Sequence, residues 1–241
     1  MRIIVIGLVS ISLSTPSLAV DLAIPDLPPW SIQATDGATR GILVDSAREI
    51  SRLGGNLFSV SSLPAKRLLS ALQSGESEAA IFPSDPDIDR YATRIGVIVE
   101  VPTVVCASKG VNLANIEAVR ELKIVGVPFG LNLRGLTDDP TIHTSPEKDV
   151  PQEVRKLAAG RLDAVSGSAA AVHQAAHDLN LDDAIGSCLA IGKIEFYLYA
   201  SNNTKKITQD KILETYNYFE KSGSFSAIKG KYVAEDWRPI K

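Results

Sequence analysis

The strongest constraint on the fold is a repeated alternation of short apolar strands with amphipathic helices. Strand-like runs cover residues 22–24, 57–60 and 79–82, and helical runs over 42–53 and 65–73 separate them. In the helical runs, apolar residues recur every three or four positions, the spacing of one helix face. Strands that alternate with helices predict a parallel sheet with right-handed crossover helices.

The same alternation begins again in the second half of the chain, after a long β-branched run over residues 97–107. Residues 136–150 contain two prolines and many polar side chains, and they predict an irregular excursion. The elements expected are helices over 116–122, 151–159 and 169–180, strands over 123–127, 161–165, 188–191 and 194–200, and closing helices over 208–219 and 225–233. Gly192 separates the last two strands.

Two strand-like connections, near residues 101–106 and 196–200, predict that the second unit is inserted into the first. We therefore expect an α/β fold of two lobes, each a mostly parallel sheet flanked by helices, with two crossing strands as a hinge. Lobe 1 would comprise residues 20–104 and 198–241, and lobe 2 would comprise residues 105–197.

Residues 1–19 have the pattern of a secretory signal peptide. Arg2 supplies a positive charge, residues 3–13 form an apolar core too short to span a membrane, and small residues lead to Ala19. Cleavage after Ala19 would leave residues 20–241, enough for one large domain or two small lobes. We therefore expect an exported, periplasmic protein.

The charge distribution excludes one class of partner. The formal net charge is −3, the charged residues are dispersed, and aromatic residues make up only 6% of the chain. A nucleic-acid-binding protein is expected to carry a basic patch or stripe. We therefore expect no nucleic-acid partner.

The two cysteines, Cys106 and Cys188, would meet oxidising conditions in an exported protein. Each lies in an apolar, strand-like segment, far from the other in sequence. The sequence leaves two structures open, a disulfide between them or a pair of buried thiols that act as small hydrophobic residues.

Patterns for metal binding are incomplete. His173 and His177 have the spacing of a zinc-binding helix, but Gln174 stands where a metalloprotease has glutamate. The acidic run from Asp85 to Asp89 resembles the start of a calcium-binding loop. Position six of that loop should be glycine and position twelve glutamate, and neither residue is present. The sequence also lacks the glycine-rich patterns of nucleotide-binding loops, so it predicts no catalytic residue, metal or cofactor.

Polar and aromatic residues gather instead in loops that follow the predicted strands, where an open α/β sheet binds its ligand. The candidate ligand-binding residues are Trp30, Arg67, Ser84, Asp85, Arg90, Gly130, Asn132 and Ser168. An arginine can bind a carboxylate through two parallel hydrogen bonds, and a tryptophan can stack on a flat ligand. The helix N-termini after Gly130 and Ser168 can offer N–H groups to an anion. The alternatives are an ordinary solvated turn for residues 84–90 and simple packing for Trp30.

Five segments, in order, resemble the amino-acid-binding type of periplasmic solute-binding protein, family 3. They are the Leu-Pro-Pro-Trp turn at 27–30, the Gly-x-x-x-Asp step at 41–45, the helix–Gly–strand step at 64–80, the Gly-Arg-x-Asp-Ala-Val strand at 160–165 and the helical hairpin near 221–228. The resemblance implies two lobes that close on a small-molecule ligand. It also implies a monomer that delivers this ligand to an inner-membrane ABC permease.

The resemblance is weaker at the ligand contacts. Arg90 falls on the arginine that holds the α-carboxylate in amino-acid binders, but a proline-rich, acidic segment replaces the family's Gly-Met-x-Thr-x-x-Glu before it. Of the family's Gly-Ser/Thr anion loop only Gly130 matches, followed by Leu131 and Asn132, and Ser168 stands where an aspartate takes the α-amine. We therefore expect a small polar solute related to amino acids, with Arg90 either binding it or pairing with a neighbouring aspartate. The alternatives are a dehydratase-like lyase on the same scaffold and a sensory or accessory binding module.

Overall fold

The computed structural model describes residues 19–33, 38–128, 131 and 133–232. The predicted signal peptide, except for Ala19, lies outside these residues. Within the described part of the chain, no helix has the length and apolar character needed to cross a membrane.

One eight-stranded mixed sheet runs through the molecule in the order β4-β1-β5-β10-β6-β9-β7-β8. Its strands are β1 (Val20–Pro25), β4 (Phe58–Leu63), β5 (Ala79–Pro83), β6 (Ala92–Ser108), β7 (Val125–Pro128), β8 (Thr144–Glu147), β9 (Ala164–Ser168) and β10 (Ile185–Ser201). Strands β2 (Ile32–Gln33) and β3 (Thr39–Arg40) form a separate antiparallel pair. In the main sheet β1 is parallel to β4 and β5, and β7 is parallel to β8 and β9.

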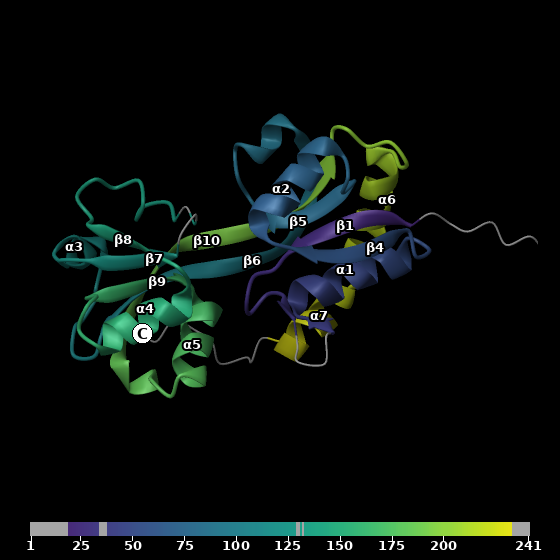
Figure 1. Ribbon diagram of the computed structural model, residues 1–241. Coiled ribbons are helices and arrows are strands. Elements are labelled where there is room, and N and C mark those ends of the chain that lie inside the picture. The colour runs from purple at the N-terminus through teal and green to yellow at the C-terminus, as the bar shows by residue number, and fades with distance from the viewer. Residues whose placement is uncertain (1–18, 34–37, 129–130, 132, 233–241) are drawn as a thin grey trace, which may run out of the picture.

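The long strands β6 and β10, 17 residues each, join the two parallel groups. They are antiparallel to each other, while β10 also pairs with β5 and β6 also pairs with β9. Figure 1 shows them crossing from one group of helices to the other. The predicted architecture, two mostly parallel α/β groups joined by two crossing strands, is confirmed.

Helices cover both faces at each end of the sheet (Figure 1). They are α1 (Ile42–Leu53), α2 (Ala65–Ser74), α6 (Gln209–Ser222) and α7 (Ser224–Tyr232) at one end, and α3 (Ile116–Arg120), α4 (Val150–Ala158) and α5 (Ala169–Asp178) at the other. Gly75 ends α2 with a left-handed φ of 75°, and a Cβ there would lie 2.3 Å from the backbone oxygen of Asn203. Only glycine satisfies both conditions, so the chain turns into β5 at this position.

Two expectations about the strands are wrong. The excursion over 136–150 is not wholly irregular, because β8 pairs parallel with β7 there. Gly192 does not split the second crossing strand; a register shift between Ala190 and Gly192 absorbs it within β10. Pro102 also lies inside a strand, at the residue of β6 just before the segment that pairs with β9. At that position β6 has a neighbour on one side only, which is where a strand tolerates proline.

The apolar core follows the same division. A large cluster at the first end contains Leu22, Ile42, Leu198 and other buried residues, and separate clusters fill the second end around Val105 and Val165. Ile194 of β10 packs against both the first cluster and the one around Val105. The crossing strands therefore connect the two cores, which also meet where Ala170 of α5 packs against the first cluster.

Candidate ligand-binding site

The loop after β5 is held in shape by a hydrogen bond to β10 and by hydrogen bonds within the loop. The Ser84 N–H donates to the backbone oxygen of Glu195 at 2.8 Å, and Oδ1 of Asp85 accepts from the Asp87 N–H at 2.8 Å. A short 3-10 helix, η1 (Ile88–Arg90), follows, and Ile88 is buried beneath it. These contacts fix the backbone and leave the exposed Ser84 and the charged groups at the surface.

Arg90 pairs with an aspartate of its own loop. Its guanidinium lies 3.1 Å from Oδ1 of Asp87, and the Arg90 side chain is 79% exposed. Asp89 is engaged elsewhere, because Arg94 donates two hydrogen bonds of 2.7 Å to its carboxylate. To bind a ligand carboxylate, the Arg90 guanidinium would therefore have to release Asp87, because the two carboxylates would compete for the same N–H donors.

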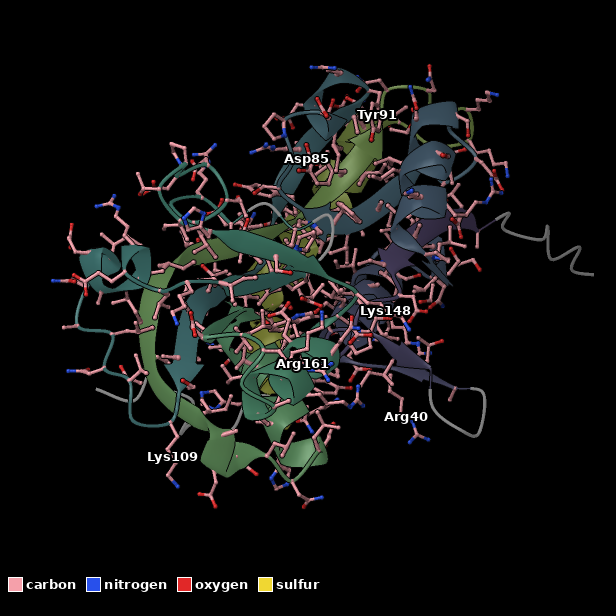
Figure 2. The ribbon with its side chains drawn as sticks, turned by 60° about the vertical axis from the view of Figure 1, so that its left-hand side comes forward. Arg40, Asp85, Tyr91, Lys109, Lys148 and Arg161 are labelled. Carbon is pink, nitrogen blue, oxygen red and sulfur yellow. A yellow bond between two sulfur atoms is a disulfide. The ribbon has the colours of Figure 1, made fainter. Side chains whose placement is uncertain are left out.

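Aromatic residues that were not predicted from the sequence lie beside this loop. The Arg94 guanidinium carbon lies 4.9 Å from the centre of the Tyr197 ring, a cation–π contact. Burial raises the pKa of Tyr91, and the nearby carboxylates of Asp85 and Asp87 raise it further. Figure 2 shows Asp85 and Tyr91 in the same part of the molecule. Tyr91 follows Arg90 directly and could have been found from the sequence, whereas Tyr197 becomes a neighbour only through the pairing of β5 with β10.

Trp30 belongs to the loop that follows β1, and it is buried in the core. Its side chain is 6% exposed and its ring centre lies 5.8 Å from that of Phe196. It belongs to the large apolar cluster, against which Ala170 from the start of α5 also packs. Packing in the core thus explains the position of the Trp30 side chain in this structure. Contact between Trp30 and a ligand stays a prediction.

The other candidates are distributed over both ends of the sheet. Arg67 on α2 forms an ion pair with Glu76 at 2.5 Å. Ser168 is buried at the end of β9 and caps α5, since its Oγ accepts from the Ala171 N–H at 3.2 Å. One of the N–H groups expected to hold an anion is therefore already satisfied. Gly130 and Asn132 lie outside the described residues.

Cys106 and Cys188 form a disulfide, so the first of the two structures left open by the sequence is confirmed. The sulfur atoms are 2.02 Å apart and the Cα atoms 4.0 Å apart. The two residues are directly opposite each other on β6 and β10 and are buried. The bond joins the crossing strands where they enter the second end of the sheet.

A buried carboxyl group, which was not predicted from the sequence, lies on the face of α4 that packs on the sheet. Glu153 has no exposed surface, its Oε2 accepts from the Ser166 N–H at 3.0 Å, and its Oε1 has no hydrogen-bond partner among the described residues. Burial raises the pKa of Glu153 to about 8, although the hydrogen bond from Ser166 opposes the shift. Its helical spacing from Val150, Val154 and Leu157 places it on the apolar face, a signal visible in the sequence.

Within the part of the chain that the structure describes, the two histidines of α5 gain no further metal ligand. His177 lies 3.8 Å from Asp182. Among the described residues no group of three or more His, Cys, Asp or Glu side chains is arranged to hold a metal ion.

No family model matches the sequence, and no curated protein matches it. Solved structures match along almost the whole chain. An ancestral arginine-binding protein bound to arginine has a TM-score of 0.71 at 18% identity, covering 90% of this chain and 98% of that one. A histidine kinase sensor domain with similarity to periplasmic binding proteins has a TM-score of 0.69 at 17% identity, covering 90% and 96%. The substrate-binding protein of an amino-acid ABC transporter has a TM-score of 0.69 at 17% identity, covering 89% and 98%. The chain therefore has an α/β fold of the periplasmic-binding-protein type.

Proposed function

We propose that the protein captures a small, polar, amino-acid-like solute outside the cytoplasm, between two lobes that close on it. The lobes would be residues 20–104 with 198–241, and residues 105–197. The observation that carries the proposal is the connection between the two parallel strand groups, which within the described part of the sheet consists of β6 and β10. Two bodies joined by two strands can change their relative angle while each keeps its core, which is how hinge closure buries a ligand.

The loop over residues 84–91 provides the chemistry for such a ligand. Arg90 is suited to a carboxylate, and Asp85 and Asp87 are suited to an amine. The pair between Arg90 and Asp87 is solvent-exposed, so exchanging Asp87 for a ligand carboxylate costs little. We propose that Ser84 and Ser168, with Gly130 and Asn132, complete the polar contacts from the two sides of the cleft.

Binding without catalysis is favoured over a dehydratase-like enzyme. Among the described carboxyl groups, Glu153 alone has a clearly raised pKa, the property expected of a catalytic acid. Its side chain is fully buried between α4 and the sheet, where a substrate has no access to it. We propose that the solute is delivered to an ABC permease, and the likeness in fold to the binding protein of an amino-acid ABC transporter supports this role. Sensing is the second candidate, because a kinase sensor domain has the same fold over the same length.

Thermal unfolding in the presence of amino acids, amines and organic acids tests the proposal. A ligand that binds only the folded state at a hundred times its Kd stabilises it by about 2.7 kcal/mol, and the melting temperature rises accordingly. Arg90→Gln should abolish the rise for any ligand that carries a carboxylate. Arg161→Gln is the matched control, because Arg161 is an exposed arginine in a different part of the molecule (Figure 2). A panel in which no compound of any class stabilises the native protein would contradict the proposal.

A further inference from the structure

The crossing between the two ends of the sheet contains a short stretch with no third strand beside it. Strand β5 pairs with residues 196–200 of β10, and β9 pairs with residues 103–107 of β6. Between these limits, residues 100–102 of β6 pair with residues 193–195 of β10 and no third strand flanks them, and the only backbone hydrogen bond from the β5 side is the one that the Ser84 N–H donates to Glu195 among the described residues. Register shifts adjoin this stretch on both sides, at Gly192 and at Tyr197. Bending between the two ends would therefore be concentrated in three residue pairs.

This stretch places two carboxylates directly opposite each other. Glu100 on β6 faces Glu195 on β10. Like charges at directly opposed positions of neighbouring strands repel. Lys193 resolves the conflict, since its Nζ lies 2.5 Å from Oε1 of Glu100 and 2.9 Å from Oε1 of Glu195. The hydrogen bonds to Glu100 and Glu195 raise the pKa of Lys193, and the hydrogen bond from Lys193 lowers that of Glu195.

The cluster is connected to the candidate binding loop. Tyr197 Oη donates to Oε2 of Glu195 at 3.0 Å, and the guanidinium of Arg94 lies over the Tyr197 ring. Arg94 in turn donates two hydrogen bonds to Asp89, which belongs to η1. A continuous line of polar contacts thus runs from the loop that would hold the ligand to the stretch that would bend.

We propose that Lys193 is an electrostatic clamp on the hinge, which holds Glu100 and Glu195 together and keeps the two unflanked strand segments paired in the ligand-free protein. The proposal rests on the proposed function in one respect, that the two ends of the molecule move as lobes. Without Lys193 the two carboxylates are left opposed and unneutralised. The predicted consequence is local opening of the crossing, and a second substitution that removes one carboxylate should relieve it.

Hydrogen exchange by mass spectrometry tests the clamp on the native protein and on Lys193→Met, Lys193→Met/Glu100→Gln and Lys211→Met. Lys211 is the matched control, because it forms a comparably exposed ion pair with Glu214 at 2.8 Å on α6. We expect Lys193→Met to accelerate amide exchange over residues 96–102 and 190–196 by about fivefold. The reason is that the free energy of local opening falls by the contribution of one favourable ion-pair network. The double variant should recover most of the native protection, and Lys211→Met should match the native protein at the crossing.

Three results would overturn the clamp: native exchange in Lys193→Met, no recovery in the double variant, or equal acceleration in β1, which would mean global destabilisation. Thermal shift on the same variants separates this proposal from the proposed function. If no solute stabilises the native protein while the exchange pattern is as predicted, the binding function fails and the clamp stands. If solutes stabilise every variant while exchange at the crossing is unchanged, the clamp fails and the binding function stands.

Discussion

The disulfide between Cys106 and Cys188 joins directly opposed positions of the two crossing strands. The residues are 82 positions apart in sequence, so the bond closes a loop that contains most of the second end of the molecule. A cross-link of this kind stabilises mainly by restricting the unfolded chain, and more so for a long loop.

Replacing both cysteines, Cys106→Ala/Cys188→Ala, should lower the free energy of unfolding by about 2–4 kcal/mol. Guanidinium denaturation followed by circular dichroism measures the change. The native protein unfolded in excess reductant should give the same midpoint as the double variant, since both lack the cross-link. An unchanged midpoint in the variant would show that the disulfide contributes nothing to stability.

Glu153 should make the protein less stable as the pH rises from about 4.5 to about 8. The pKa of its buried carboxyl is about 8 in the folded protein against an ordinary value of 4.5, so in this range the folded state holds a proton that the unfolded state has lost. The contribution of Glu153 to the free energy of unfolding is fully present below pH 4.5. Above that pH it declines by up to about 1.4 kcal/mol per pH unit. Glu153→Gln should flatten this part of the stability–pH curve, and Glu121→Gln, at an exposed position, should leave it unchanged. Parallel curves for Glu153→Gln and the native protein would contradict the assignment.

Asp163 and Glu78, at opposite ends of the sheet, each accept hydrogen bonds from two consecutive backbone N–H groups. One oxygen of Asp163 accepts from the N–H groups of Lys123 and Ile124 at 2.7 and 3.1 Å, and the Glu78 carboxylate accepts from two consecutive N–H groups, those of Lys206 and Ile207. Asp163→Ala and Glu78→Ala should each cost about 1–3 kcal/mol, because backbone donors lose their acceptor. Urea denaturation provides the measurement, and a cost within error of zero for both variants would contradict these roles.

Trp30 should behave as a core residue in the ligand-free protein. In a Trp237→Phe background it is the remaining tryptophan of the chain's two. Its emission should be blue-shifted and resistant to iodide, and Trp30→Ala should lower stability by about 3–5 kcal/mol. Quenching comparable to that of free tryptophan would place the indole in solvent and contradict its burial against Phe196.

The alternation of helices and strands was enough to predict the fold, because apolar periodicity reflects which face of each element is buried. The elements that were missed depend on distant partners. Residues 144–147, Thr-Ser-Pro-Glu, have no apolar alternation, and they become β8 through pairing with β7. The sequence predicts that Gly192 interrupts the strand, but the register shift beside it keeps β10 continuous.

For the candidate binding loop, the position was predictable from the sequence, and the side-chain contacts were not. The loop over 84–90 was identified because it follows an apolar strand, and the structure places it there. Which aspartate pairs with Arg90, and the position of Arg94 over Tyr197, depend on side-chain packing between β5, β6 and β10. Sequence spacing alone contains no such information.

Small-angle X-ray scattering with and without a stabilising solute tests the central claim most directly, that the solute binds between two lobes that close. We expect a smaller radius of gyration at saturating solute for the native protein and for Arg161→Gln, with no change for Arg90→Gln. A solute that raises the melting temperature while the radius of gyration of the native protein stays constant would contradict closure between the lobes.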